Sequence, residues 1–135
     1  MMLDIKLLIV DDEERFLKTI KTLLEKRECA ISTATNGVEA LEILEKKQID
    51  VVILDVKMPG MDGVEVLRRI KRDHPLVEVI MLTGHSTTES AIQGMKLGAF
   101  DYLLKPCDID ILITTVLEAR DKKKAMEEKI NRVRS

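Results

Sequence analysis

Short apolar runs alternate with longer amphipathic segments along the whole chain. Runs rich in Val, Ile, Leu and Thr predict strands at residues 5–10, 30–34, 50–55, 78–83 and 101–105. Apolar residues three or four positions apart predict helices at residues 13–27, 36–47, 63–73 and 86–98, and from 108 toward the end of the chain. Alternating strands and helices are typical of α/β proteins with a parallel sheet.

Polar residues at the segment boundaries support these helices. Asn36 with Glu39, and Ser86 with Glu89, have the spacing of helix-capping pairs, and Asp108 is placed to begin the last helix. Right-handed crossovers would lay the helices on both faces of the sheet. We therefore predict an α/β fold: a flavodoxin-like (βα)5 doubly wound parallel sheet, strand order 2-1-3-4-5, with an extended C-terminal helix.

Composition narrows the class of protein. A length of 135 residues suits one domain, and 45% hydrophobic residues suffice for a core. A net charge of −2 argues against direct nucleic acid binding, and no apolar stretch approaches the ~20 residues of a membrane span. The first apolar run is too short for a signal peptide. Cys29 and Cys107 lack metal-binding spacing, so we expect reduced thiols and a cytoplasmic protein.

Four predicted strands end in residues that carry chemistry. Asp11 and Asp12 follow the first strand, Asp55 closes the third, and Thr83 and Lys105 end the fourth and fifth. Parallel strands point the same way, so these side chains are expected at one edge of the sheet. Clustered carboxylates repel one another, and a hard cation such as Mg²⁺ relieves that repulsion. A carboxylate beside Mg²⁺ can attack a phosphoryl group, which makes Asp55 a candidate nucleophile.

Each of these residues also has an ordinary structural explanation. Acids such as Asp11 and Asp12 are common at helix starts, and an Asp before a Pro-Gly turn, as at Asp55, is common as well. Thr is a frequent strand residue, and Lys105 alone would be a surface lysine. Their joint occurrence at four strand ends favours a phosphoryl site. The Lys105-Pro106 bond is a candidate for the cis form.

The pattern resembles the receiver domain of bacterial two-component response regulators, the CheY-like superfamily, over roughly residues 4–122. The matching motifs are Asp11-Asp12, Asp55 with Met58-Pro59-Gly60-Met61-Asp62-Gly63, Thr83-Gly84, Phe100-Asp101-Tyr102 and Lys105-Pro106. The resemblance implies that Asp55 accepts a phosphoryl group from a histidine kinase or a phosphotransfer protein. It also implies that Thr83 and Lys105 hold that group.

Further roles follow from the same resemblance. Asp12 and Asp55 would bind Mg²⁺ directly, Asp11 would help through a water, and the backbone carbonyl of Lys57 would be a further ligand. Tyr102 would turn inward as Thr83 moves, which remodels the fourth helix, the fifth strand and the fifth helix. The domain would be a signalling module with self-catalysed phosphotransfer and slow autodephosphorylation, not a turnover enzyme.

Two positions in this family tune the lifetime of the phosphoryl group, and here they are Lys57 and His85. Neither is a small amide or acid that would hold a hydrolytic water well. We therefore expect a phosphoryl lifetime of minutes or more. Exposed rim residues without such a role are the competing interpretation.

The end of the chain carries a second pattern. We expect a receiver domain over residues 1–121 and a helical extension or linker over 122–135. Apolar residues of the last helix follow a heptad spacing broken only by Lys123: Ile109, Leu112, Val116, Ala119, Met126, Ile130 and Val133. The extension is either a frayed, solvated helix or a coiled coil. A coiled coil would dimerise the domain or lead to an output domain beyond Ser135, and a homodimer could also use the helix-four, strand-five and helix-five face.

Three other functions compete with the phosphoacceptor switch. An aspartyl-phosphate phosphatase of the haloacid-dehalogenase type needs a second Asp where this chain has Lys57. A flavodoxin needs a phosphate loop after the first strand, where the acids from Asp11 to Glu14 would repel the phosphate. A receiver-like protein-interaction module that is never phosphorylated is the third alternative, and intact Asp55, Thr83 and Lys105 argue against it.

Overall fold

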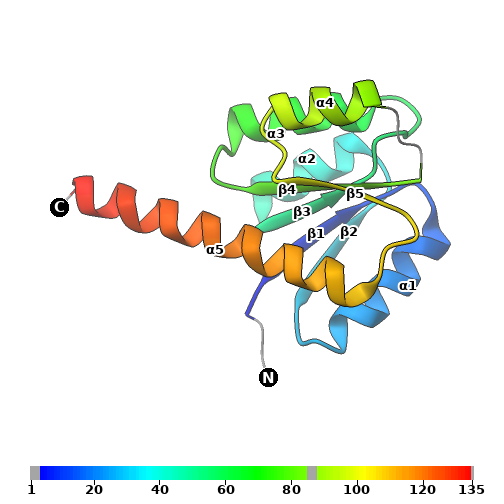
Figure 1. Ribbon diagram of the computed structural model, residues 1–135, viewed down its shortest axis with the longest axis horizontal. Coiled ribbons are helices and arrows are strands. Elements are labelled where there is room, and N and C mark those ends of the chain that lie inside the picture. Colours follow the sequence, from blue (N-terminus) through cyan, green and yellow to red (C-terminus); the bar gives the residue numbers. More distant parts are fainter. Residues whose placement is uncertain (1–3, 85–87, 135) are drawn as a thin grey trace.

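The computed structural model describes residues 4–84 and 88–134 as one five-stranded parallel sheet with helices on both faces (Figure 1). The strands are β1 (Lys6–Val10), β2 (Ala30–Ala34), β3 (Val51–Leu54), β4 (Glu78–Thr83) and β5 (Asp101–Leu104). The helices are α1 (Glu14–Glu25), α2 (Gly37–Lys46), α3 (Gly63–Asp73), α4 (Thr88–Lys96) and α5 (Ile109–Arg134). The strand order is β2-β1-β3-β4-β5, so the predicted fold class and topology are confirmed.

The alternation of side chains along the strands builds two apolar layers. Leu8 and Val10 of β1 face the layer under α2 and α3, whereas Leu7 and Ile9 face the layer under α1 and α5. The central strands β1, β3 and β4 are almost entirely buried because helices cover both faces. This burial explains why their sequences read as continuous aliphatic runs.

Most predicted boundaries agree with the structure to within two residues. The Asn36 side chain accepts a hydrogen bond from the Glu39 N–H at 2.9 Å, which confirms the predicted cap of α2. Asp108 accepts one from the Asp110 N–H at 2.8 Å and begins α5. The predicted cap at Ser86 lies outside the described residues, as does His85. The Lys105-Pro106 peptide bond is cis.

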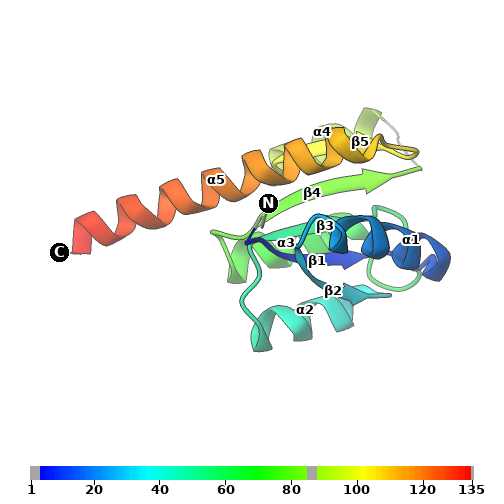
Figure 2. The same ribbon diagram turned by 90° about the horizontal axis from the view of Figure 1, so that it is seen from below.

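Helix α5 is unlike the other helices in length and position. It has 26 residues, and its last buried residue is Ala119. Figures 1 and 2 show that it runs back along the sheet and projects past the amino-terminal ends of the strands. Within the described ranges, no helix is both long enough and apolar enough to cross a membrane.

Candidate phosphoryl and metal site

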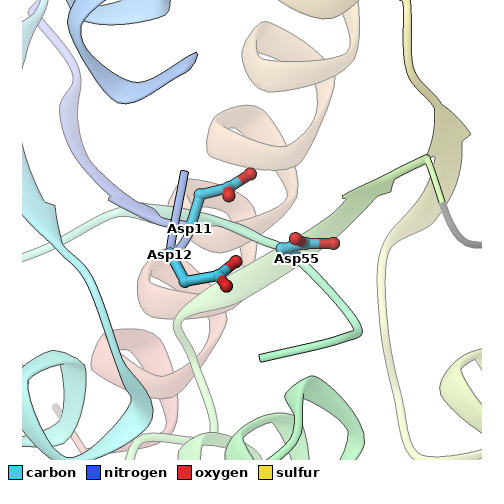
Figure 3. A group of neighbouring side chains, drawn as sticks. All are labelled: Asp11, Asp12 and Asp55. Atoms are coloured by element: carbon cyan, nitrogen blue, oxygen red, sulfur yellow. The ribbon is translucent and has the colours of Figure 1, made fainter. Parts of the chain in front are cut away.

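The ends of β1 and β3 bring three carboxylates together at the carboxyl-terminal edge of the sheet. The backbone N–H of Asp11 donates to the Ala34 carbonyl at 3.1 Å, and that of Asp55 donates to the Val10 carbonyl at 3.0 Å. These bonds extend the sheet by one residue and fix where the two side chains emerge. Figure 3 shows the side chains of Asp11, Asp12 and Asp55 gathered at this edge.

We call Asp11, Asp12 and Asp55 the acidic cluster. One carboxylate oxygen from each lies within 4.8 Å of the others, a spacing that fits a single cation. Asp11 and Asp55 are 1% and 2% exposed, whereas Asp12 is open to solvent. Hard oxygen donors with one solvent-facing member suit Mg²⁺, which retains several waters when bound. The donor set therefore fits the predicted metal.

Lys105 brings an ammonium group to the site. Its Nζ donates a short hydrogen bond to Asp11 Oδ2 and lies 3.3 Å from Glu13 Oε1 and 3.9 Å from Asp55 Oδ2. The ammonium also lies over the ring of Phe16, 4.0 Å from its centroid. A single ammonium thus faces three nearby acids, and in this structure its closest partner is Asp11.

Two pKa shifts reflect this crowding. Burial raises the pKa of Asp11 above its ordinary 3.8, and repulsion from Asp55 adds to that rise; together they outweigh hydrogen bonds from Lys105 and the Glu13 N–H. Burial alone would lower the pKa of Lys105, but Asp11, Asp55 and Glu13 together raise it above 10.5. Near neutral pH the ammonium therefore keeps its proton.

The turn after β3 is held tightly against the site. The Gly63 N–H donates to the Val56 carbonyl at 2.7 Å, and a Cβ added at Gly63 would lie 2.1 Å from the Asp55 carbonyl oxygen. Only glycine allows this approach of α3 to the end of β3. Asp62 caps α3 by accepting from the Glu65 N–H at 2.9 Å. Asp55 itself accepts from the Val56 N–H at 2.8 Å.

The remaining predicted site residues lie around this centre. Thr83 is fully buried at the end of β4, and its carbonyl accepts from the Lys105 N–H at 2.9 Å. Lys57 is exposed in the loop directly after β3. Tyr102 is half-buried in β5 and its hydroxyl lies 3.1 Å from the Ser90 hydroxyl of α4. The structure thus places Thr83 and Lys105 on the same edge as the acidic cluster and Tyr102 beside α4.

Several contacts at this edge were not foreseen from the sequence. Glu13 and Phe16, both in the first turn or cap of α1, contact Lys105 from a distant part of the chain. Helical periodicity predicts only that Phe16 lies on the apolar face of its helix. Asp11 also combines the two interpretations given above, because its Oδ1 accepts from the Glu13 N–H at 2.9 Å while Oδ2 meets Lys105.

The whole chain was compared with known proteins and protein families. The response regulator receiver domain matches residues 7–117. The DNA-binding transcriptional regulator NtrC of Escherichia coli K12 is 40% identical over 111 residues, covering 82% of this chain and 24% of NtrC. A putative NtrX-like response regulator of Rickettsia bellii is 39% identical over 129 residues, covering 94% of this chain and 27% of that protein. This chain therefore spans about a quarter of the length of these relatives.

Solved structures show the same relationship. A response regulator receiver domain protein from Clostridium thermocellum superposes with a TM-score of 0.86 at 42% identity, over 90% of this chain and 98% of that one. NtrX from Brucella abortus superposes with a TM-score of 0.87 at 30% identity, over 93% of this chain and 29% of that one. The chain belongs to the response regulator receiver domain family, the regulatory signalling domain of two-component systems.

Proposed function

We propose that this chain is a phosphoacceptor switch whose nucleophile is Asp55. The observation that carries the proposal is the buried Asp55 carboxylate, within 4.8 Å of Asp11 and Asp12 and 3.9 Å from Lys105. A carboxylate oxygen of Asp55 attacks the phosphorus of a phosphohistidine on a histidine kinase or phosphotransfer protein. The new P–O bond forms as the P–N bond breaks, and the imidazole nitrogen keeps the electron pair.

The neighbouring residues have distinct tasks. Lys105 needs only a small movement from Asp11 to reach a phosphoryl oxygen on Asp55, and the Thr83 hydroxyl donates to another. Asp11, Asp12, Asp55 and the Lys57 carbonyl would hold Mg²⁺, which neutralises charge on the transferred group. The domain then acts as a regulatory switch with slow autodephosphorylation, not as a turnover enzyme.

Intact-mass analysis after incubation with Mg²⁺ and acetyl phosphate tests this function. We expect one added phosphoryl group in the wild type and none in Asp55→Asn or in EDTA. An unmodified wild type, with the fold intact by circular dichroism, would leave the chain as an unphosphorylated protein-interaction module.

We also propose that α4, β5 and α5 form the surface that changes on phosphorylation. Helix α4 buries only Gly94 among its described residues, so it is weakly attached to the sheet. Apolar side chains are half-exposed on α4, on β5 and at the start of α5: Ile92, Met95, Leu104 and Ile111. The hydroxyl contact between Tyr102 and Ser90 links β5 to α4 and would break if Tyr102 turned inward. A bistable packing of this kind converts a local change of charge into a new surface.

Beryllofluoride, a mimic of the phosphoryl group, tests the switch by NMR. We expect amide shift changes that extend from Thr83 through α4 and β5 in the wild type. Ser90→Ala removes one partner of Tyr102 and should leave a larger fraction in the activated state. Shift changes confined to the acidic cluster would contradict the switching surface.

Lys57 and His85 support the proposal of a phosphoryl lifetime of minutes or more. Lys57 is an exposed ammonium with no carboxylate or amide to orient a water. Radiolabel loss should quicken in Lys57→Asn and His85→Glu. Loss within seconds in the wild type, unchanged by either substitution, would refute this.

Two kinds of partner are proposed for this chain, an output domain and a second copy of the chain. Because NtrC is a DNA-binding transcriptional regulator and much longer than this chain, we propose that an output domain C-terminal to Ser135 reads the switch. A homodimer would form through the α4-β5-α5 surface or through α5. Light scattering with and without beryllofluoride tests this, and a monomer at every concentration would exclude the homodimer for this chain.

A further inference from the structure

The outgoing part of α5 lies beyond the apolar core yet remains helical. Residues 120–134 of this helix include none that is buried. A segment of this length is only marginally helical by itself in water. Figures 1 and 2 show this part of α5 projecting past the amino-terminal edge of the sheet. Contacts where it leaves the sheet are therefore needed to hold it in that direction.

Two carboxylates stand at that edge on neighbouring strands. Asp50 directly precedes β3, and Glu78 is the first residue of β4; the Glu78 N–H donates to the Asp50 carbonyl at 3.2 Å. Glu78 is 4% exposed, although a buried carboxylate is costly without a charged partner. Within the described part of the chain, its Oε1 has no hydrogen-bond partner, since Lys71 Nζ lies 3.6 Å away.

Consecutive lysines of α5 meet these two carboxylates. Lys122 Nζ lies 3.3 Å from Glu78 Oε2, and Lys123 Nζ lies 3.2 Å from Asp50 Oδ1. Lys123 also pairs with Glu127 one turn further along α5, at 3.2 Å. The residue that breaks the heptad spacing, Lys123, is thus the one that reaches the start of β3.

Attachment at two points has a geometric consequence. Neighbouring residues on a helix project about 100° apart, and neighbouring strands lie about 4.8 Å apart. A single ion pair would leave the helix able to rotate and tilt about its contact. Two pairs, from adjacent helix positions to adjacent strands, restrict both movements.

We propose that Asp50, Glu78, Lys122 and Lys123 form an ion-pair joint that sets the direction in which α5 leaves the receiver. Asp50 and Glu78 act as positioning residues for the helix. The joint lies on the strands whose opposite ends carry Asp55 and Thr83. It holds whether or not Asp55 is phosphorylated, so it is independent of the proposed function.

Amide hydrogen exchange on the full chain tests the joint. In Lys122→Gln/Lys123→Gln we expect the amides of residues 124–134 to exchange at least about five-fold faster than in the wild type. Lys124→Gln, an exposed neighbour on the same turn, is the matched control and should exchange as the wild type does. Lys122 is exposed and Lys123 is partly buried, so the sheet amides are followed in the same experiment to show that the fold is retained.

Residual dipolar couplings provide a second readout of direction. In the wild type, residues 112–119 and 124–132 should fit one helix axis, and in the double variant they should not. If the double variant showed the same amide exchange rates and the same dipolar couplings as the wild type, the proposed joint would be wrong. Protection that depends on protein concentration and ignores both lysines would also overturn it, since self-association would then stabilise the helix.

Discussion

The two edges of the sheet both bring lysines to carboxylates, but in different proportions. At the carboxyl-terminal edge, Lys105 faces Asp11, Asp55 and Glu13, and Asp12 adds a further acid to the cluster. At the amino-terminal edge, Glu78 lies between Lys71 and Lys122, and Asp50 pairs with Lys123, so no carboxylate of this group lacks a lysine. An edge with excess negative charge attracts a cation and a reacting group, whereas a balanced edge holds two elements together. Both edges use the same residue types, lysines and carboxylates. What distinguishes the phosphoryl site from the structural attachment of α5 is therefore the number of acids for each lysine.

Removing one lysine from each edge should give the largest contrast. Lys105→Met leaves Asp11 and Asp55 without their ammonium, so we expect a loss of about 3 kcal/mol in unfolding free energy without Mg²⁺. Millimolar Mg²⁺ should restore most of it. Denaturant unfolding at pH 7 with and without Mg²⁺ measures both effects.

Lys123→Met is the counterpart at the other edge. Asp50 is partly exposed and keeps a hydrogen bond from the Lys6 N–H, so the expected loss is below about 1 kcal/mol and independent of Mg²⁺. Equal responses of the two variants to Mg²⁺ would remove the distinction between the edges.

Close packing at the carboxyl-terminal edge predicts the next effect. Gly63→Ala would force its Cβ against the Asp55 carbonyl, so we expect about 2 kcal/mol of destabilisation and slower phosphorylation by acetyl phosphate. Gly84→Ala is the control on the same edge, since its nearest contact would be Lys105 Cβ at an ordinary 3.9 Å. Wild-type behaviour of Gly63→Ala would show that this edge tolerates displacement of β3.

The two edges should also respond at opposite ends of the pH scale. The pKa of Asp11 is raised, so its carboxyl takes up a proton above pH 3.8 as the solution is acidified. The stability gained from protonating Asp11 is fully present below the pKa of this carboxyl in the unfolded chain. It is lost as the pH rises through the pKa of Asp11 in the folded protein. The Mg²⁺-induced rise in Tm should therefore shrink on acidification, beginning above pH 3.8, as measured by scanning calorimetry.

At the amino-terminal edge the corresponding group is Lys123, whose pKa is also raised but lies at the alkaline end of the scale. Burial alone would lower its pKa, but hydrogen bonds and attraction from Asp50 and Glu127 raise it above 10.5. The contribution of Lys123 to folding stability is complete below the pKa of this lysine in the unfolded chain. It disappears as the pH rises through the pKa of Lys123 in the folded protein. The stability difference between wild type and Lys123→Met should vanish only in strong alkali, and a loss near neutral pH would contradict the assignment.

The smallest predicted effect concerns Phe16. Phe16→Leu keeps an apolar side chain but removes the ring beneath Lys105, a contact worth about 0.5–1 kcal/mol. Beryllofluoride binding should weaken about three-fold, and Phe16→Tyr should restore it. Equal affinities in Phe16→Leu and the wild type would show that the acids around Lys105 orient it without the ring.

The sequence predicted the carboxyl-terminal edge far better than the amino-terminal one. Asp11, Asp55, Thr83 and Lys105 follow apolar runs, and the parallel topology alone brings strand ends together. Their positions needed no knowledge of side-chain packing. The fold class and strand order followed from the same alternation.

The contacts made by helices could not be predicted in this way. Periodicity shows that Phe16 faces the protein, but not that its ring lies under Lys105. Likewise, Lys123 appeared only as an interruption of a heptad, because its partner Asp50 is 73 residues away. Glu78 could have been flagged as an acid that begins an apolar run, yet its partner depends on where α5 crosses the sheet.

The two lysines of the joint also matter for building chimeric regulators. A foreign effector fused directly after Asp121 would discard Lys122 and Lys123 and leave Glu78 buried beside Lys71 alone. A fusion made after Glu127 would carry both lysines and the Glu127 carboxylate that pairs with Lys123. Receivers transplanted with the longer boundary should deliver their effectors in a defined orientation, whereas those cut at the shorter one should behave as tethered, independently tumbling modules.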